Sequence, residues 1–152
     1  WYTWIIDAKP LLTAYDGVAD GKVSAMVIMG NPIIFWGIIP CLLFMLYRSI
    51  FKKDRTALFL ITAYIFQYLP WAFIGRIVFI YHYLPASIFG MLILGYTFKL
   101  LLDKTKSAKI FISIYLSAVV IAFIIFYPVL SGRPVDPEYF HKLEWLPHWL
   151  WR

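Results

Sequence analysis

Four long runs of apolar residues alternate with short polar stretches along most of the chain. The runs cover about residues 24–47, 57–75, 77–102 and 110–127, and three of them contain no charged residue. Each run is close to the roughly 20 residues that a helix needs to cross a bilayer. We therefore predict an all-α integral membrane fold, a bundle of about four transmembrane helices.

Two aromatic, polar segments flank these runs, at residues 1–23 and 128–152. Both contain tryptophan, turn-forming residues and charges of both signs, which is typical of chain lying in the membrane interface. We expect interfacial aromatic tails and a single membrane region over residues 1–152. Because the sequence opens at Trp1 without a signal-peptide pattern, we interpret it as part of a larger protein.

Prolines fall inside three of the predicted helices. A proline in a helix interior removes one hydrogen bond, and a membrane helix tolerates this loss where neighbouring helices satisfy the freed carbonyl. Kinks are therefore expected at Pro32, Pro40, Pro70 and Pro85. The kink at Pro85 should leave the Tyr81 carbonyl without its helical partner and could open a pocket.

The composition and the placement of charge support this topology. The chain is 62% hydrophobic and only 14% charged, whereas soluble domains carry about 25% charged residues. The net charge of +6 comes from compact clusters between apolar runs, which argues against a nucleic-acid partner and predicts cytoplasmic loops by the positive-inside rule. Both chain ends should then be external. The clustered basic residues are Arg48, Lys52, Lys53, Arg55, Lys99, Lys104, Lys106 and Lys109.

Polar side chains gather at the predicted external ends of the helices. Asn31 lies near the external end of the first of them, Gln67 lies near the external end of the second, and Arg76 lies in the short connection to the third. A guanidinium at this depth can bind a lipid-linked phosphate in a bidentate way, but it can equally be a simple headgroup anchor. Asn31 and Gln67 are more often hydrogen-bonding contacts between helices than ligands.

His82 shares a helical face with the small residues Ala86 and Gly90. Small faces pack against other helices, so the His82 ring is expected to point into the bundle. An interhelical hydrogen bond, a substrate contact and proton transfer all remain open for it.

No catalytic residue or metal site is assigned. The four runs contain no Asp or Glu that could act as a general base. His141 and His148 lie in the tail without a short ligand spacing to His82, and Cys41 is the single cysteine. From its chemistry alone, the chain binds or packs and does not obviously catalyse.

The segment YLPWAFIGRIVFIYHYLPA, residues 68–86, resembles a signature of the C-terminal four-helix region of protein O-mannosyltransferases, in which an Arg precedes a Tyr-His-Tyr-x-Pro-Ala stretch. Shorter segments in the family's order support this resemblance, and together they cover nearly the whole chain. They are WYTWIIDAKPLL at 1–12, GNPIIFW at 30–36, YPVLSG at 127–132 and WLPHWLW at 145–151.

This resemblance implies a GT-C type membrane enzyme of glycosyltransferase family 39. Such enzymes transfer mannose from a polyprenyl phosphate, dolichyl phosphate in eukaryotes, to Ser or Thr hydroxyls of proteins on the external or lumenal face. The family's essential acids lie in an N-terminal loop that this sequence does not contain, so the fragment alone is expected to be inactive. The matching positions expected to contact the donor lipid or its sugar are Arg76, Tyr81, His82, Tyr83 and Asn31, with Pro32 and Pro85.

The resemblance also implies the partners and the location of the protein. The partners would be membrane lipids, the polyprenyl-phosphate sugar donor, the protein acceptor and the N-terminal helices of the same enzyme, with no nucleic acid and no cofactor. The protein would lie in the plasma membrane of a prokaryote or the endoplasmic reticulum of a eukaryote. The sequence shows no sign of the MIR domain of many eukaryotic members, which favours the prokaryotic type.

Two other functions stay open from the residues. One is a non-catalytic membrane module, an accessory subunit or part of a transporter, in which His82 and the prolines serve packing or gating. Transporters usually place ionisable or unwound elements near the bilayer midplane, whereas here these elements lie toward one face, which favours the enzyme. The other is a related GT-C enzyme with a different acceptor.

Overall fold

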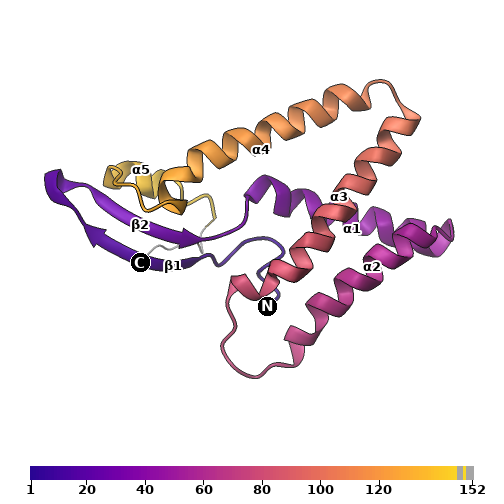
Figure 1. Cartoon of the computed structure of the whole chain (residues 1–152), viewed down its shortest axis with the longest axis horizontal. Helices are drawn as coiled ribbons and strands as arrows, with labels where there is room; N and C mark the ends of the chain where they lie inside the picture. Colours follow the sequence, from indigo (N-terminus) through magenta and orange to yellow (C-terminus); the bar gives the residue numbers. More distant parts are fainter. Residues whose placement is uncertain (147–148, 150–152) are drawn as a thin grey trace.

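The computed structural model describes residues 1–146 and 149, and four long helices dominate it (Figure 1). All four, two of them with short 3-10 extensions, are long and apolar enough to cross a bilayer. The prediction of about four transmembrane helices is therefore confirmed, and the chain is an integral membrane region. The helices are α1 (Pro32–Phe51), α2 (Arg55–Tyr68), α3 (Leu84–Lys104) and α4 (Ala108–Leu130).

A two-stranded antiparallel hairpin precedes α1 and was not anticipated (Figure 1). Strand β1 (Leu11–Gly17) pairs with β2 (Val23–Ile28), and the short 3-10 helix η1 (Ala19–Gly21) lies in the turn between them. Asp20 and Gly21 have positive φ angles of 66° and 71° in this turn, a conformation that glycine adopts without steric cost.

The hairpin corrects the start of the first predicted span, residues 24–47. Alternate side chains of β2 are buried, with Val23, Ala25 and Val27 exposing only 8%, 1% and 3% of their surface. A burial period of two belongs to a strand that lies on a packed surface, not to a helix. The first transmembrane helix begins at Pro32 instead.

Helices α1, α2 and α3 pack against one another and form the larger core. Small residues allow their close approach: a Cβ atom added to Gly90 of α3 would lie 2.8 Å from the Cδ1 atom of Ile38 of α1. The predicted packing face of the third helix, with Ala86 and Gly90, is confirmed. Residues of this core with no measurable exposure include Met45, Ala57, Ala86 and Ile93.

Helix α4 lies apart from α2 and packs at its end against β2 and the short helix α5 (Pro137–Lys142) (Figure 1). Phe126 and Val129 of α4 meet Phe140 of α5 in this second, smaller core. Gly132 ends α4 with a φ of +69°, and the Arg133 N–H donates to the Pro128 carbonyl at 2.9 Å. This is the hydrogen bond of a glycine-terminated helix.

The prolines stand mainly at the starts of helices. Pro32 and Pro85 occupy the first turns of α1 and α3, where the missing N–H needs no partner. Pro70 lies in the 3-10 helix η2 (Leu69–Phe73), after the end of α2. Of the four prolines expected to kink helices, Pro40 alone lies inside a regular helix.

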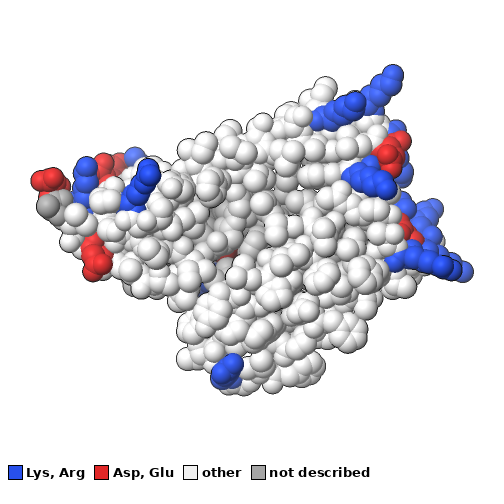
Figure 2. All heavy atoms as spheres, in the orientation of Figure 1, with Lys and Arg blue, Asp and Glu red and all other residues white. Residues whose placement is uncertain are grey.

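Charge is concentrated at two ends of the molecule, with a broad uncharged zone between them (Figure 2). We call one end the basic end: it contains the α1–α2 and α3–α4 connections and the clustered basic residues from Arg48 to Lys109. We call the opposite end the hairpin end, and it contains β1, β2, α5 and the α2–α3 connection. Four apolar helices joining two charged ends fit a membrane-spanning bundle.

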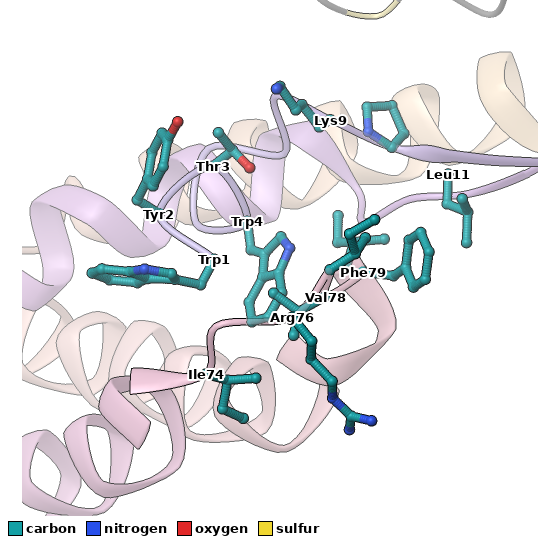
Figure 3. A pocket seen from close by; sticks show the side chains of 13 residues that line it. Trp1, Tyr2, Thr3, Trp4, Lys9, Leu11, Ile74, Arg76, Val78 and Phe79 are labelled. Carbon is teal, nitrogen blue, oxygen red and sulfur yellow. The ribbon is translucent and has the colours of Figure 1, made fainter. Parts of the chain in front are cut away.

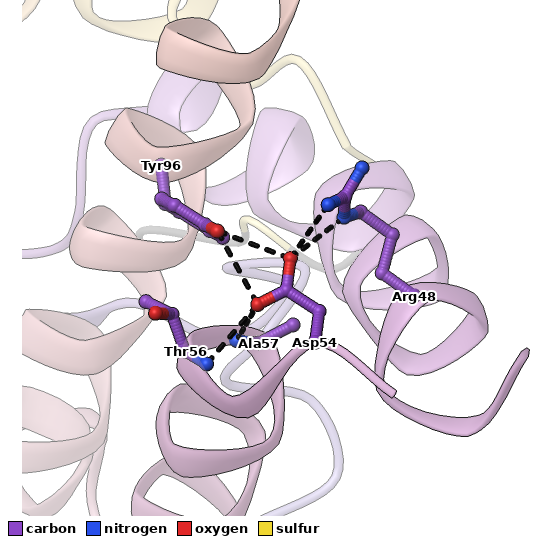
Figure 4. Close-up of polar contacts among 5 residues, drawn as sticks. All are labelled: Arg48, Asp54, Thr56, Ala57 and Tyr96. Atoms are coloured by element: carbon purple, nitrogen blue, oxygen red, sulfur yellow. Dashed lines mark hydrogen bonds and ion pairs between the residues drawn. The ribbon is translucent and has the colours of Figure 1, made fainter. Parts of the chain in front are cut away.

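A polar cluster joins three helices at the basic end (Figure 4). Asp54 caps α2, because its Oδ1 atom accepts the backbone N–H groups of Thr56 and Ala57 at 3.0 and 3.1 Å. Its Oδ2 atom lies 2.7 Å from an Arg48 nitrogen of α1 and accepts the Tyr96 hydroxyl of α3 at 3.0 Å. We call this group the Asp54 clamp.

Candidate functional site

The connection between α2 and α3 is irregular and carries most of the predicted site residues. After η2, residues 74–79 have no regular structure, and the 3-10 helix η3 (Ile80–Tyr83) leads into α3. The Tyr81 carbonyl was expected to lack a partner, but it accepts the backbone N–H of Leu84. The 3-10 geometry of η3 thus supplies the hydrogen bond that Pro85 cannot make.

A pocket of about 530 Å³ opens at the hairpin end, between this connection and the N-terminal segment (Figure 3). Two cationic residues, Lys9 and Arg76, line it, and no acidic side chain is among the described residues that do so. Figure 3 shows the two charged groups on different sides of the Trp4 ring, pointing away from each other. The other walls are largely apolar and aromatic, and include Trp1, Trp4, Ile77, Val78 and Phe79. We call this space the cationic pocket.

Both cations are available to bind an anion. Lys9 and Arg76 are exposed, and the ion pairs found within the described chain include neither of them. A guanidinium beside an aromatic surface can bind a phosphate group in a bidentate way, and an ammonium group in the same pocket adds positive potential. Arg76 was predicted for this role; Lys9 and Trp4 had been assigned only to the interfacial segment. The signal that could have found them is the WYTWIIDAKP stretch, where tryptophans closely precede a Lys-Pro pair.

His82 lies beside the pocket but not inside the bundle. Its ring is 4.4 Å from the Trp71 ring, stacks on Tyr81 at 4.3 Å and lies parallel to Trp4 at 6.2 Å, between centroids. Its Nδ1 atom is 3.0 Å from the Phe79 carbonyl oxygen. The expectation that His82 follows the packing face of α3 is therefore corrected, because the residue belongs to η3, whose tighter winding turns it onto the aromatic cluster.

Tyr81 and Tyr83 differ in their surroundings although only one residue separates them. Tyr83 is 1% exposed, and its hydroxyl lies 2.8 Å from the hydroxyl of Tyr64 of α2. Tyr81 is 43% exposed. Tyr83, at the end of η3, therefore contacts α2 in the core, while the ring of Tyr81 lies at the surface of the hairpin end.

Asn31 is the N-cap of α1. Its Oδ1 atom accepts the backbone N–H of Ile33 at 3.1 Å, and its Nδ2 group donates to the Val119 carbonyl of α4 at 2.9 Å. The first bond pairs a backbone N–H group at the start of α1, and the second joins α1 to α4. Asn31 thus makes a hydrogen bond between helices, the role expected from the sequence to be more frequent for it than a ligand contact.

The structure divides the predicted site residues between two spaces. Asn31, Tyr81 and Tyr83 line a second cavity of about 210 Å³, while Arg76 lines the cationic pocket. Ile80 lines both spaces, so they adjoin at η3. This second cavity is otherwise largely apolar and lies between the start of α1 and the first turns of α3.

One buried acid of the hairpin end escaped the sequence reasoning. The Asp7 side chain has no exposure, and neither of its carboxylate oxygens has a hydrogen-bond partner among the residues that the structure describes. Burial raises its pKa to about 7, against a smaller opposing effect of the nearby Gly30 backbone N–H. The backbone carbonyl of Asp7 accepts the indole N–H of Trp149 at 2.5 Å. Asp7 thus lies inside the N-terminal turn whose first residues form a wall of the cationic pocket.

Within the described residues, no group of three or more His, Cys, Asp or Glu side chains is arranged to hold a metal ion. The fold and the site together define a four-span membrane region with a cationic, aromatic pocket at one end. A family model described as the C-terminal four TMM region of protein-O-mannosyltransferase matches residues 1–149. The chain therefore belongs to this family, as its Arg and Tyr-His-Tyr-x-Pro-Ala signature predicted.

Individual relatives agree with this assignment. The polyprenol-phosphate-mannose–protein mannosyltransferases of Mycobacterium tuberculosis and Mycolicibacterium smegmatis are 26% and 24% identical to it, over 97% of this chain. The chain spans about a third of the length of these curated relatives, 31% in each case. The solved Saccharomyces cerevisiae protein O-mannosyltransferase Pmt1-Pmt2 complex, bound to the sugar donor, shares the fold with a TM-score of 0.80 at 20% identity, covering 97% of this chain and 23% of that one.

Proposed function

We propose that this chain is the donor-binding membrane region of an enzyme that transfers mannose from a polyprenyl phosphate to Ser or Thr hydroxyls of proteins. The names of its relatives support the reaction. The observation within this chain that supports a donor-binding role is the cationic pocket, in which Lys9 and Arg76 meet an aromatic wall without an acidic residue between them. The donor is a substrate, and the proposal requires no further cofactor.

The charges of the pocket fit the chemistry of such a donor. A polyprenyl-phosphate sugar is a phosphodiester with one negative charge, and the departing polyprenyl phosphate carries more charge as its bond to the sugar breaks. Arg76 would hold the phosphate before transfer and stabilise the added charge during it, while Lys9, on the other side of the Trp4 ring, adds positive potential to the pocket. The rings of Trp1 and Trp4 would cover the apolar part of the donor.

The remaining groups must come from other parts of the enzyme. In the transfer, the acceptor hydroxyl oxygen bonds to C1 of mannose, the bond from C1 to the phosphate oxygen breaks, and the phosphate leaves with the electron pair. The hydroxyl proton needs a base, and the described lining of the pocket contains no carboxylate. We expect that base in the two-thirds of the enzyme that this chain does not span.

The hairpin end is the external face in this proposal. The basic end gathers eight Lys and Arg residues in two short connections and in the helix ends beside them, and such basic regions stay in the cytoplasm. A cysteine introduced at Asp20 should react with an impermeant reagent added from outside, while one introduced at Lys106 should not. The reverse pattern would place the cationic pocket in the cytoplasm and remove it from an external reaction.

Replacement of Arg76 in the full-length enzyme tests the donor site. We expect Arg76→Ala to raise the KM for the polyprenyl-phosphate donor about 10-fold to 100-fold, because a charged hydrogen bond contributes about 1.5–3 kcal/mol. Membrane insertion and thermal stability should change little, since the side chain is exposed and has no ion pair within the described chain. Arg76→Lys should recover part of the loss, because it restores the charge without the bidentate geometry.

Arg133 offers a matched control at the same end. Its guanidinium lies 5.0 Å from the centre of the Tyr127 ring and does not line the cationic pocket. Arg133→Ala removes the same charge and should leave the donor KM within about twofold, since solvent and salt screen a distant surface charge. Unchanged donor kinetics in Arg76→Ala, or an equal loss in both variants, would favour a packing module over a donor site.

A further inference from the structure

The outer edge of β1 is open. Strand β1 pairs on one side with β2, and β2 in turn bridges to Val135, with two Val23–Val135 backbone hydrogen bonds of 2.9 Å. Among the described residues no backbone partner lies on the other side of β1, and its last five residues are exposed. The outward N–H and C=O groups of such a strand form a template on which another extended chain can pair.

This open edge leads into the cationic pocket. Leu11 is the first residue of β1, and Leu11, Pro10 and Lys9 all line the pocket opposite Arg76. Figure 3 shows the backbone continuing from Lys9 through Leu11 away from the pocket. The four residue steps from Leu11 to Tyr15 extend about 13 Å. An extended chain paired along this edge would therefore have one end at the mouth of the pocket.

We propose that the outer edge of β1 is the docking strand for the acceptor polypeptide, which rests on the function proposed above. The acceptor binds in an extended conformation, adds a third strand to the hairpin and delivers a Ser or Thr hydroxyl to the donor held by Arg76. A lipid cannot satisfy the alternating donors and acceptors of a strand edge, whereas a peptide backbone can.

This mode of binding has a consequence for specificity. Backbone pairing depends little on side chains, so the edge would accept many sequences around the modified hydroxyl. The bulge between Leu12 and Ala14 interrupts the regular register close to the pocket, and bulges bend a strand and re-aim its side chains. The regular part of the edge, Ala14–Gly17, would hold the peptide several residues away from the hydroxyl that reacts.

A backbone-methylation scan of the acceptor tests the docking on the unaltered full-length enzyme. Each peptide in the series carries one Ser or Thr and a single N-methyl group at one position. We expect the KM for the peptide to rise about tenfold at alternate positions on one side of the hydroxyl, and to change little between them. The reason is that only every second N–H faces the docking strand, and an N-methyl group both removes one hydrogen bond and adds bulk at the strand edge. A profile without this period of two overturns the docking proposal.

A proline variant tests the same edge from the enzyme side. Val23 makes its backbone hydrogen bonds with Val135 and not with Gly17. The alternating pattern therefore directs the Tyr15 N–H outward and the Ala14 N–H toward β2. Tyr15→Pro removes an outward donor while keeping the hairpin paired.

The Tyr15→Pro variant should raise the peptide KM about tenfold with an unchanged donor KM and thermal stability. Val18→Ala, at an exposed residue just outside β1, is the control and should stay within about threefold. A peptide KM that Tyr15→Pro leaves unchanged overturns the proposal.

Two further outcomes separate the possible errors. If the unaltered enzyme neither binds the polyprenyl-phosphate donor nor transfers mannose to the unmethylated peptide, the proposed function itself fails. The second outcome concerns a Tyr15→Cys variant in an enzyme whose transfer is normal. If this variant forms a disulfide between two copies of the chain and keeps its peptide KM after the crosslink, the edge is a contact between copies. The docking proposal then fails, while the proposed function stands.

Discussion

Two aspartates shielded from solvent stand at opposite ends of the molecule, and their surroundings are opposite too. Asp54 at the basic end accepts two backbone N–H groups, an arginine and a tyrosine hydroxyl. Asp7 at the hairpin end has no partner for either carboxylate oxygen within the described chain. At the basic end, hydrogen bonds to Asp54 hold the helices in place. At the hairpin end, the buried carboxyl of Asp7 lowers the free energy of unfolding.

The pKa of each aspartate follows from this difference. Burial acts to raise the pKa of Asp54, but the Ala57 N–H, the Arg48 guanidinium and the Tyr96 hydroxyl outweigh it and hold the pKa below its ordinary value. For Asp7 burial prevails, and the pKa rises to about 7. The comparison shows that the basic end is built to hold helices together. The hairpin end, where we place the ligands, tolerates an unsatisfied group and exposed cations.

The largest predicted effect comes from the pH dependence at Asp7. Its folded-state pKa of about 7 lies above the ordinary value of 3.8, so the folded state binds more protons between these limits and stability falls as the pH rises through them. The full interval corresponds to about 4 kcal/mol. Asp7→Asn should remove this slope and stabilise the protein at pH 8, as measured by thermal unfolding of the full-length enzyme in mild detergent.

Asp16→Asn supplies the control for this measurement. Asp16 is an exposed aspartate of β1, so its replacement should leave the pH dependence of the unaltered protein in place. Equal slopes in Asp7→Asn and in the unaltered protein would show that Asp7 does not titrate in the buried position that the structure gives it.

The sequence predicts the helices far better than it predicts the hairpin end. Runs such as residues 110–127 are long and uniformly apolar, and the bilayer permits almost only a helix for them. The same apolar character concealed β2, because most of VSAMVI falls in the first long apolar run although Gly30 and Asn31 separate it from α1, and its alternating burial pattern reveals a strand. The surroundings of Asp7 were equally hidden, since its backbone carbonyl accepts a hydrogen bond from Trp149, 142 positions along the chain.

The candidate site could be predicted only in part, for a related reason. Arg76 is recognisable because a cation in a turn between two apolar runs must lie close to the membrane surface, where lipid headgroups and lipid-linked phosphates are within its reach. Lys9 lies 67 positions earlier, and the folded N-terminal turn alone brings it to the same pocket. Tyr83 was grouped with the donor contacts, yet its contact with Tyr64 depends on how α2 and η3 pack.

The second predicted effect is the loss of the Asp54 clamp. Asp54→Ala removes the cap of α2 and leaves Arg48 without its partner, and Arg48 is only 21% exposed. We expect a loss of about 3 kcal/mol, the sum of a cap and a largely shielded ion pair. Asp54→Asn, which can still cap the helix, should lose less. Chemical denaturation of the full-length enzyme in detergent measures both.

The Asp54 clamp should also respond to pH in the sense opposite to Asp7. Because the pKa of Asp54 is lowered from 3.8, its contribution to stability is present above that value and is lost as the pH falls through and below it. A matched denaturation series at acidic pH should therefore show the unaltered protein approaching the stability of Asp54→Ala. A difference between them that persists at the lowest pH would contradict the assigned ion pair.

The smallest predicted effects come from one chemical change made at each end. Tyr96→Phe deletes the hydroxyl that donates to the ionised Asp54 carboxylate at 3.0 Å, and Tyr68→Phe deletes the hydroxyl that donates to the Trp1 carbonyl at 3.1 Å in an exposed position. Hydrogen bonds to charged groups contribute about 1.5–3 kcal/mol, while those between neutral groups contribute about 0.5–1.5 kcal/mol, and water can replace an exposed one. We therefore expect a loss of about 2 kcal/mol for Tyr96→Phe and at most about 0.5 kcal/mol for Tyr68→Phe, measured by the same denaturation. Equal losses would mean that the hairpin end is held by polar bonds as firmly as the basic end, and the contrast between the two ends would not hold.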